Sequence, residues 1–346
     1  MGTQKNVNVA ILLATYNGGK FVGQQIESLK ENNVSFFVAW IDDHSTDNTC
    51  DVVRETAKKT NIRVEEFHQK KHLGMPGTFF HLLESVEADI YMYCDQDDIW
   101  QPGKIDATVA SLCEDIDSPL LCFSDPLWFS SDSGPDTCEK LWGFTDSQAE
   151  KALQKSRSFM FIPAFGHTIG FTRRLRDIFM KHKEVAKAHA YGHDWWMYLI
   201  AMATGQVRML SGVPTTLYRR HPDQFSSVYY TSIPKGKRGL DQFPPHWELQ
   251  QAWRRIIAKQ ASGFIIASST FPQGVNATQL LTIATIVSKI DQKQSLITLI
   301  RLACSRAMWP RMHVALRLAF VCLRSDAKEP SVRKPQRSTN SSPGLT

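Results

Sequence analysis

Short apolar runs alternate with segments of helical periodicity over the first 120 residues of the chain. Residues 9–14 are almost continuously apolar, as in a strand covered on both faces, and Val22, Ile26 and Leu29 then recur at the spacing of one helix face. Further strands are predicted at residues 36–41, 62–67 and 90–94, with helices between them through Val53 and Leu83. Repeated strand-helix units predict an α/β fold with a mostly parallel sheet flanked by helices. Ser45 or Thr46 is placed to cap the helix through Val53.

The pattern loosens after residue 120. The sequence predicts strands at 120–123 and 161–171, a basic helix at 175–188, an apolar helix at 194–203 and extended structure at 207–218. A Pro, Gly and Lys-rich stretch follows, and then a long region of helical pattern. We therefore expect a catalytic domain at 1–225, a linker at 226–245, a helical C-terminal region at 246–324 and a disordered tail at 325–346.

Composition changes this picture little. The 346 residues are 42% hydrophobic, enough for a large core, and the net charge of +6 is spread along the chain. That charge fits an ordinary basic surface as well as a polyanion partner, and we expect no nucleic-acid partner. The seven cysteines form no C-x-x-C pair, which favours a reducing compartment. With a polar start and no long uninterrupted apolar stretch, the chain is expected to be cytoplasmic, possessing neither a signal peptide nor a spanning helix.

Three predicted strands end in polar residues. In an open parallel sheet, ligands bind outside the carboxyl ends of the strands, so these ends are the first place to look for a site. The three polar ends are Thr15-Tyr16-Asn17, Asp42-Asp43-His44-Ser45-Thr46-Asp47 and Asp95-Gln96-Asp97-Asp98.

The last of these ends crowds Asp95, Asp97 and Asp98 at one point. Such like charges repel one another unless a cation neutralises them. Mg²⁺ or Mn²⁺ suits carboxylate oxygens and completes its coordination with water and substrate phosphate oxygens. The cluster therefore predicts a metal and diphosphate site, and the alternative is an acidic turn with helix-capping aspartates.

These motifs resemble those of the inverting glycosyltransferases of family 2, which have the GT-A fold. The resemblance covers about residues 7–225, and it rests on the three polar strand ends taken in order, the last extended by Ile99-Trp100. Within the family the chain looks most like the bacterial rhamnosyltransferase branch. The motifs shared with that branch are Cys94 to Trp100, His193-Asp194-Trp195-Trp196 and Tyr218-Arg219-Arg220-His221.

The resemblance implies roles on the donor side of the site. Thr15, Tyr16 and Asp43 would line the base and ribose pocket together with Asn17, and Asp42 is the alternative base contact. Asp95 would contact ribose or diphosphate, Asp97 would bind the metal, and His221 would approach the metal or diphosphate. Arg219 or Arg220 would hold leaving-group charge. Gln96, Asp98, Trp100, His193 and Trp195 would support the site.

Asp194 matches the general base that takes the proton of the acceptor hydroxyl. Each of these assignments has a simpler alternative. Asp194 can instead cap the helix that follows it, and His221 can be an ordinary loop residue. Trp195 and Trp196 can belong to the core, with a sugar-facing role for one of them as the alternative. Asp98 is open between support of the site and a helix cap.

The implied reaction is a single displacement with inversion. It needs a base for the nucleophile and positive charge for the departing diphosphate, and it needs no enzyme nucleophile. The expected donor is dTDP-rhamnose, with a UDP-hexose as the alternative, and the expected acceptor is a cell-surface polysaccharide or lipid-linked saccharide. Two other classes are a sugar-1-phosphate nucleotidyltransferase and a non-catalytic saccharide-binding subunit. A nucleotidyltransferase ordinarily has a Gly-rich, Arg-containing loop after the first strand, and this chain lacks that loop. The intact aspartates argue against a non-catalytic subunit.

Two departures from the family pattern concern the donor side. The stretch 72–79 lacks the two asparagines that the family often has there, and His44 stands where glycine is common. Neither change removes a proposed metal ligand or base. Both leave the identity of the donor sugar open.

The C-terminal helical pattern is basic. Between residues 279 and 324, Asp291 is the one acidic residue beside Lys289, Lys293, Arg301, Arg306, Arg311, Arg317 and Arg324. Peripheral docking on an anionic membrane surface is one interpretation. Packing of these helices on the catalytic domain or on another subunit is the other.

Overall fold

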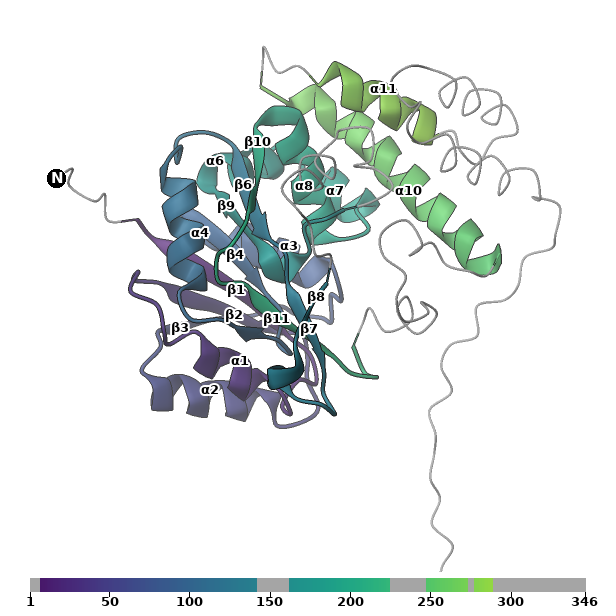
Figure 1. The fold of residues 1–346 in the computed structure, drawn as a ribbon. Coiled ribbons are helices and arrows are strands. Elements are labelled where there is room, and N and C mark those ends of the chain that lie inside the picture. The colour runs from purple at the N-terminus through teal and green to yellow at the C-terminus, as the bar shows by residue number, and fades with distance from the viewer. Residues whose placement is uncertain (1–6, 142–161, 225–246, 273–276, 289–346) are drawn as a thin grey trace, which may run out of the picture.

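The computed structural model describes residues 7–141, 162–224, 247–272 and 277–288. The predicted linker, the tail and all seven basic residues of the C-terminal pattern lie outside these ranges. Figure 1 shows a central sheet with helices packed around it and the pair α10 and α11 on one side.

The main sheet has seven strands and is parallel except for one of them, which confirms the predicted α/β class. Its order is β10-β6-β9-β4-β1-β2-β3, and β9 runs antiparallel to both β4 and β6. The strands are β1 (Val9–Thr15), β2 (Phe37–Asp42), β3 (Val64–Phe67), β4 (Ile90–Cys94), β6 (Leu120–Ser124), β9 (Ile169–Thr172) and β10 (Gln206–Leu210).

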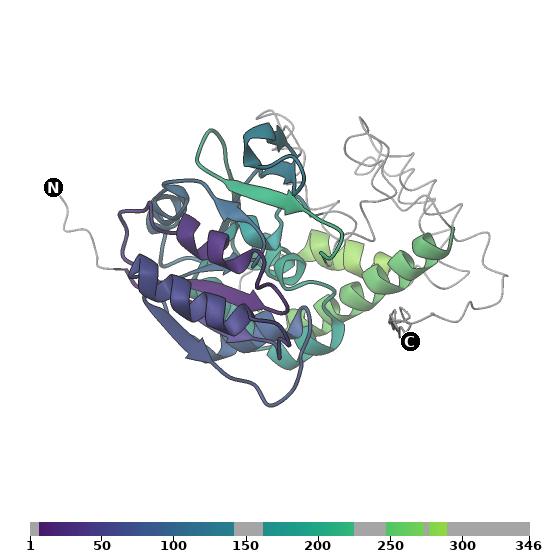
Figure 2. The same ribbon diagram turned by 90° about the horizontal axis from the view of Figure 1, so that it is seen from below.

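Both faces of this sheet are covered, as the apolar run of β1 predicts. Val9, Ile11 and Leu13 belong to one buried cluster, and Ala10 and Leu12 to the other, because successive side chains of a strand point to opposite faces. The first cluster is covered by α1 (Val22–Ser28), α2 (Thr49–Thr60) and α4 (Lys104–Cys113). The second is covered by α3 (Gly77–Ser85), α6 (Arg173–Met180), α7 (Lys183–His189) and α8 (His193–Thr204). In Figure 2, α1 and α2 lie on the side of the sheet that faces the viewer.

The parallel register brings the polar strand ends to one edge. Thr15 pairs with Asp42 at the ends of β1 and β2, and Leu13 pairs with Cys94 at the end of β4. The residues that follow β1, β2 and β4 therefore leave the sheet side by side.

A second sheet, which the sequence did not predict, packs beside this edge. Its order is β5-β11-β7-β8, formed by β5 (Ile99–Trp100), β11 (Thr216–Arg220), β7 (Leu127–Ser130) and β8 (Glu139–Lys140). Strand β11 pairs antiparallel with β5, which directly follows the acidic motif. This pairing carries Arg219, Arg220 and His221 to the site.

Three sequence predictions need correction. The basic helix at 175–188 is two helices, because the chain breaks at the buried His182, whose Nε2 accepts a hydrogen bond from Trp196 Nε1. The strand at 161–171 is reduced to β9, preceded by the 3₁₀ turn η3 (Gly166–Thr168).

The predicted cap of α2 is also wrong. Neither Ser45 nor Thr46 caps this helix, which begins at Thr49 after Asn48. The Ser45 hydroxyl instead donates to Asp42, and the Thr46 backbone N–H donates to Asn17. The Asp47 carboxylate accepts the Thr49 N–H at 3.0 Å.

The C-terminal helices share the core of the catalytic part. Helix α10 (Trp247–Ala267) places Ile257, Ala261 and Phe264 in the same buried cluster as Leu12, and α11 (Thr278–Val287) packs against α10. The short turn η5 (Ser268–Thr270) joins them to His182 through Thr270, whose Oγ1 lies 3.2 Å from His182 Nδ1. For the described helices, the structure supports packing on the catalytic domain. None of these helices has the length and apolar character needed to cross a membrane.

This packing predicts that Phe264→Ala lowers the free energy of unfolding by about 3–5 kcal/mol, since the Phe264 ring is fully buried. Ile266→Ala is the control on the same helix, because Ile266 is 52% exposed and its truncation should change stability by no more than about 0.5 kcal/mol. Urea unfolding measures both variants. Equal stabilities for the two would contradict the shared core.

Candidate active site

The ends of β1 and β4 are joined by one side chain. Gln96 Oε1 accepts the backbone N–H of Tyr16 at 2.8 Å, and Gln96 Nε2 donates to the Tyr16 carbonyl at 3.1 Å. This pair of bonds fixes the position of the Tyr16 ring, which is 48% exposed and lies 4.8 Å from the His72 ring. The predicted base and ribose residue Tyr16 is therefore an open aromatic surface held on a rigid edge.

Thr15 and Asp42 contact each other beneath this surface. The Thr15 hydroxyl donates to Asp42 Oδ1 at 2.8 Å and accepts from Trp40 Nε1 at 3.0 Å. Asp42 also accepts the N–H and hydroxyl of Ser45, and Asn17 Oδ1 accepts the N–H of Thr46. Asn17 has a φ of 48°, a conformation that asparagine tolerates better than most residues. These bonds hold the first two motifs together as one unit.

Asp43 is buried and anchors the loop before α3. Its Oδ1 accepts from Leu73 N at 2.8 Å and from Gln69 Nε2 at 2.7 Å, and its Oδ2 accepts from Gly74 N at 2.7 Å. His72 Nδ1 lies 3.0 Å from the same carboxylate. The loop that departs from the family pattern is thus attached to the predicted nucleoside pocket.

Asp97 and His221, which the sequence analysis predicts to be metal ligands, lie together. His221 Nε2 is 2.9 Å from Asp97 Oδ2, although the two residues are far apart in the chain. Arg219 supports this pair, because its Nε donates to the Asp97 carbonyl at 2.7 Å and its guanidinium lies over the Phe21 ring. The Arg220 guanidinium lies 4.1 Å from the centroid of the Trp128 ring.

Asp98 is fully buried, and of its two predicted roles the structure excludes the helix cap. It does not cap a helix, since β5 follows it and the next helix, α4, has Gly103 at its N-cap. Its Oδ1 accepts the backbone N–H of Arg219 at 3.0 Å, and its Oδ2 lies 3.0 Å from His167 Nδ1. Asp98 therefore joins the acidic motif to β11 and η3.

His167 is the site residue that the sequence analysis missed. Its Nδ1 lies 3.4 Å from Asp95 Oδ2 as well as close to Asp98, and the ring is buried. Burial lowers the pKa of His167, but the two carboxylates outweigh it and raise that pKa to about 10. A single histidine in an apolar stretch carries no sequence signal that could have indicated this role.

Asp194 lies at the start of α8, close to this cluster. The N-cap position belongs to Gly192, and the Asp194 carboxylate accepts the N–H of Gly166 at 3.1 Å and of Trp195 at 2.7 Å. The pKa of Asp194 is raised to about 6, chiefly by burial and also by the nearby Asp95, against the lowering effect of these hydrogen bonds. A carboxylate with this pKa can accept a proton near neutral pH.

The neighbours of Asp194 are core residues. The His193 ring stacks on Phe79 at 4.0 Å and meets the edge of Tyr93 at 4.5 Å, and burial lowers the pKa of His193 to about 3. Trp195 and Trp196 are buried, which favours the core interpretation over a sugar platform. Trp100 is also buried, with Lys104 Nζ 3.3 Å from the centroid of its ring.

Two groups of side chains at this edge can attract a cation. Asp95, Asp98 and His167 have ligand atoms within 4.8 Å of one another, but the side chains of Asp98 and His167 are 0% and 4% exposed, which leaves little room for substrate or water ligands. Asp97 and His221 are more accessible, at 18% and 7%. Adjacent ligands of an octahedral ion with bonds of about 2.1 Å lie about 3 Å apart, which the Asp97 to His221 distance fits.

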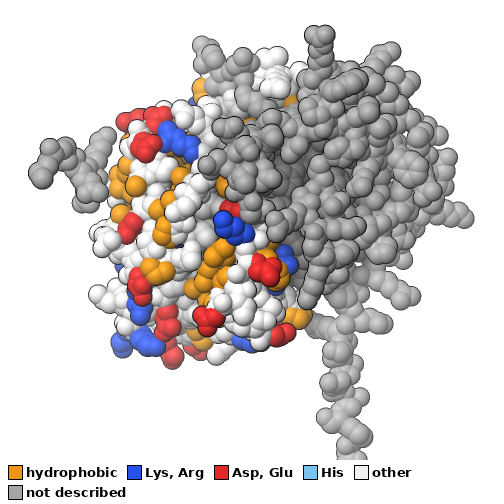
Figure 3. Space-filling model, in the orientation of Figure 1, with side chains coloured by type: hydrophobic (Ala, Val, Ile, Leu, Met, Phe, Trp, Pro, Cys, Tyr) orange, Lys and Arg blue, Asp and Glu red, His pale blue; other side chains and the backbone are white. Residues whose placement is uncertain are grey.

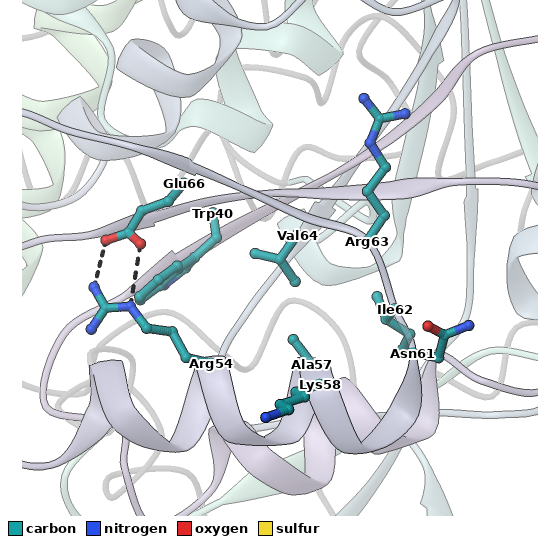
Figure 4. A pocket seen from close by; sticks show the side chains of 9 residues that line it. All are labelled: Trp40, Arg54, Ala57, Lys58, Asn61, Ile62, Arg63, Val64 and Glu66. Carbon is teal, nitrogen blue, oxygen red and sulfur yellow. Dashed lines mark hydrogen bonds and ion pairs between the residues drawn. The ribbon is translucent and has the colours of Figure 1, made fainter.

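A surface cavity of about 450 Å³ lies elsewhere, between α2 and β3 (Figure 4). The Arg54 guanidinium pairs with Glu66 at 2.7 Å and lies over the Trp40 ring. None of the side chains at the polar edge lines this cavity. Its lining residues are Trp40, Arg54, Ala57, Lys58, Asn61, Ile62, Arg63, Val64 and Glu66.

Comparisons with known proteins agree with this geometry. Residues 10–155 match the family described as glycosyl transferase family 2. The chain is 25% identical over 221 residues to the dTDP-rhamnosyl transferase RfbG of Shigella flexneri, covering 60% of this chain and 71% of that protein. It is 23% identical over 104 residues to an uncharacterised glycosyltransferase of Nostoc, covering 30% of this chain and 32% of that one.

The fold is similar to that of residues 1–349 of TarS from S. aureus, solved in complex with UDP-GlcNAc. The TM-score is 0.53 at 14% identity, with 89% of this chain and 79% of that chain covered. The match to the family model contains the three polar strand ends, and the described structure holds them at one edge of a GT-A sheet. Taken together, the family match over residues 10–155 and the similarity to the Shigella enzyme support a family 2 glycosyltransferase.

Proposed function

We propose that the enzyme transfers rhamnose from dTDP-rhamnose to a cell-surface polysaccharide or lipid-linked saccharide, with inversion at the anomeric carbon. The observation that carries the donor assignment is the similarity to the Shigella dTDP-rhamnosyl transferase over 221 residues. The open Tyr16 ring, which Gln96 holds in place, supports a nucleoside site at the ends of β1 and β2.

Asp194 acts as the general base in this proposal. Its carboxylate takes the proton of the acceptor hydroxyl as that oxygen attacks the anomeric carbon, and the bond from that carbon to the diphosphate oxygen breaks on the opposite face. The backbone N–H groups of Gly166 and Trp195 orient the carboxylate. The raised pKa makes Asp194 a stronger base than an exposed aspartate.

Asp97 and His221 would hold the divalent cation, Mg²⁺ or Mn²⁺, with Asp95 facing ribose or diphosphate. The cation, when bound, supplies the positive charge that stabilises the departing diphosphate. Arg219 keeps Asp97 in place through the Asp97 carbonyl. Arg220, which is partly exposed, would contact the negative charge of the leaving group.

The proposals for where the enzyme is located and where it meets its acceptor rest on the sequence. The cysteine usage supports a cytoplasmic enzyme. The basic pattern at 279–324 supports peripheral association with the inner face of the cytoplasmic membrane, where a lipid-linked acceptor is reached.

A donor panel tests the proposed donor. With Mn²⁺ present, dTDP-rhamnose should bind more tightly and hydrolyse faster than UDP-glucose, UDP-galactose or UDP-N-acetylglucosamine, and calorimetry and nucleotide release measure the two effects. Preference for any UDP-sugar would replace the rhamnosyl assignment with the UDP-hexose alternative.

Asp194→Asn should lower kcat on the order of 10²- to 10⁴-fold with donor binding retained, because the base is lost. In the wild type, kcat should fall about tenfold per pH unit below about pH 6, where Asp194 becomes protonated, and the variant should lack this acidic limb. The control is Asp51→Asn on the exposed side of α2, which should behave as wild type. An acidic limb that persists in Asp194→Asn would assign the base elsewhere.

Asp97→Ala should weaken donor binding as removal of the metal by EDTA does, and EDTA should have little further effect on the variant. Asp51→Ala, an exposed carboxylate change on α2, serves as the control. Titration of Mn²⁺ and donor into each protein provides the measurement. Activity of the wild type that is insensitive to EDTA would exclude the proposed metal.

A further inference from the structure

The 3₁₀ turn η3 contacts both the proposed base and the acidic motif through two consecutive residues. Gly166 donates its backbone N–H to Asp194, and His167 places Nδ1 against Asp95 and Asp98. We propose that the Gly166-His167 turn is a positioning element that sets the base in register with the donor-binding carboxylates. The inference rests on the proposed roles of Asp194 and the acidic motif.

His167 is held firmly enough to position its neighbours. Its ring is buried beside that of Tyr218, with centroids 4.9 Å apart, and its carbonyl accepts a hydrogen bond from the Thr216 hydroxyl at 2.8 Å. Among the described residues, Nε2 has no hydrogen-bond partner, so the polar function of the ring is concentrated in Nδ1. Because this one Nδ1 atom forms ion pairs with both carboxylates, it fixes the orientation of Asp95 relative to Asp98.

Gly166 has no room for a side chain. A Cβ at this position would lie 2.7 Å from His193 Nε2 and 3.7 Å from Asp194 Cβ. The His193 ring cannot withdraw easily, because it is stacked on Phe79 and edged by Tyr93. Glycine therefore allows η3 to approach the start of α8 closely enough for the N–H to reach the base.

The two residues should give different phenotypes, which separates positioning from general loss of structure. Gly166→Ala displaces the base and should lower kcat about 10- to 100-fold while binding of dTDP with Mn²⁺ stays unchanged. His167→Leu removes the donor to the carboxylates and should weaken binding of dTDP with Mn²⁺ about 10- to 100-fold.

His167→Asn is the conservative variant, since its amide N–H can occupy the place of Nδ1, and it should recover most of the lost affinity. The control for removal of a buried histidine is His182→Leu. His182 directly precedes α7, and its replacement should lower the melting temperature with kcat and nucleotide affinity unchanged. Calorimetry with dTDP or UDP in the presence of Mn²⁺, steady-state kinetics and thermal unfolding provide the measurements.

Each outcome decides the inference. The split between Gly166→Ala and His167→Leu, with rescue by His167→Asn, supports it. Equal losses in His167→Asn and His167→Leu would overturn it, because the ring would then serve as a metal ligand or a folding residue. Wild-type affinity in His167→Leu would also overturn it. If the wild type binds UDP but not dTDP, the dTDP assignment is refuted, and the variants measured with UDP still decide the role of η3. If the wild type binds neither nucleotide, both proposals are overturned.

Discussion

Burial of the Asp98 carboxylate is the constraint on which the site depends. A carboxylate without solvent needs hydrogen-bond donors on its oxygens, since an unpaired buried charge is strongly destabilising. Here the backbone N–H of Arg219 donates to one oxygen, and His167 Nδ1 forms an ion pair with the other. The need to satisfy one buried charge thus draws β11 and η3 to the end of β4 and assembles the site from segments that are distant in the sequence.

The aspartates at this edge differ in how far their side chains are exposed to solvent. Asp95 and Asp97 keep part of their surface open to solvent, whereas Asp98 is closed off. The three aspartates of one short motif therefore differ in the ligands they can accept, because only the open ones can contact water. Away from this edge, Figure 3 shows acidic and basic side chains interspersed on the visible face, in keeping with a net charge spread along the chain.

The sequence was sufficient to predict the strands whose residues follow one clear hydrophobic pattern. The strands β1, β2 and β4, covered on both faces, read as apolar runs, and their polar ends marked the site edge directly. The second sheet escaped because β5 and β8 have two residues each, too few for an alternating pattern. The cap of α2 was misassigned because Ser45 had a stronger local acceptor in Asp42. His167 acquires its partners only through tertiary contacts, so its importance could not be predicted from neighbouring residues.

The Gln96 side chain has a mechanical consequence for the ends of the first and fourth strands. The ladder between these strands ends at the pair Leu13 and Cys94, and the amide of Gln96 then makes the next two bonds to the Tyr16 backbone. A side chain thus continues the ladder beyond the last backbone pair. It acts as a spacer of fixed length, so the separation of these two strand ends is set by covalent geometry.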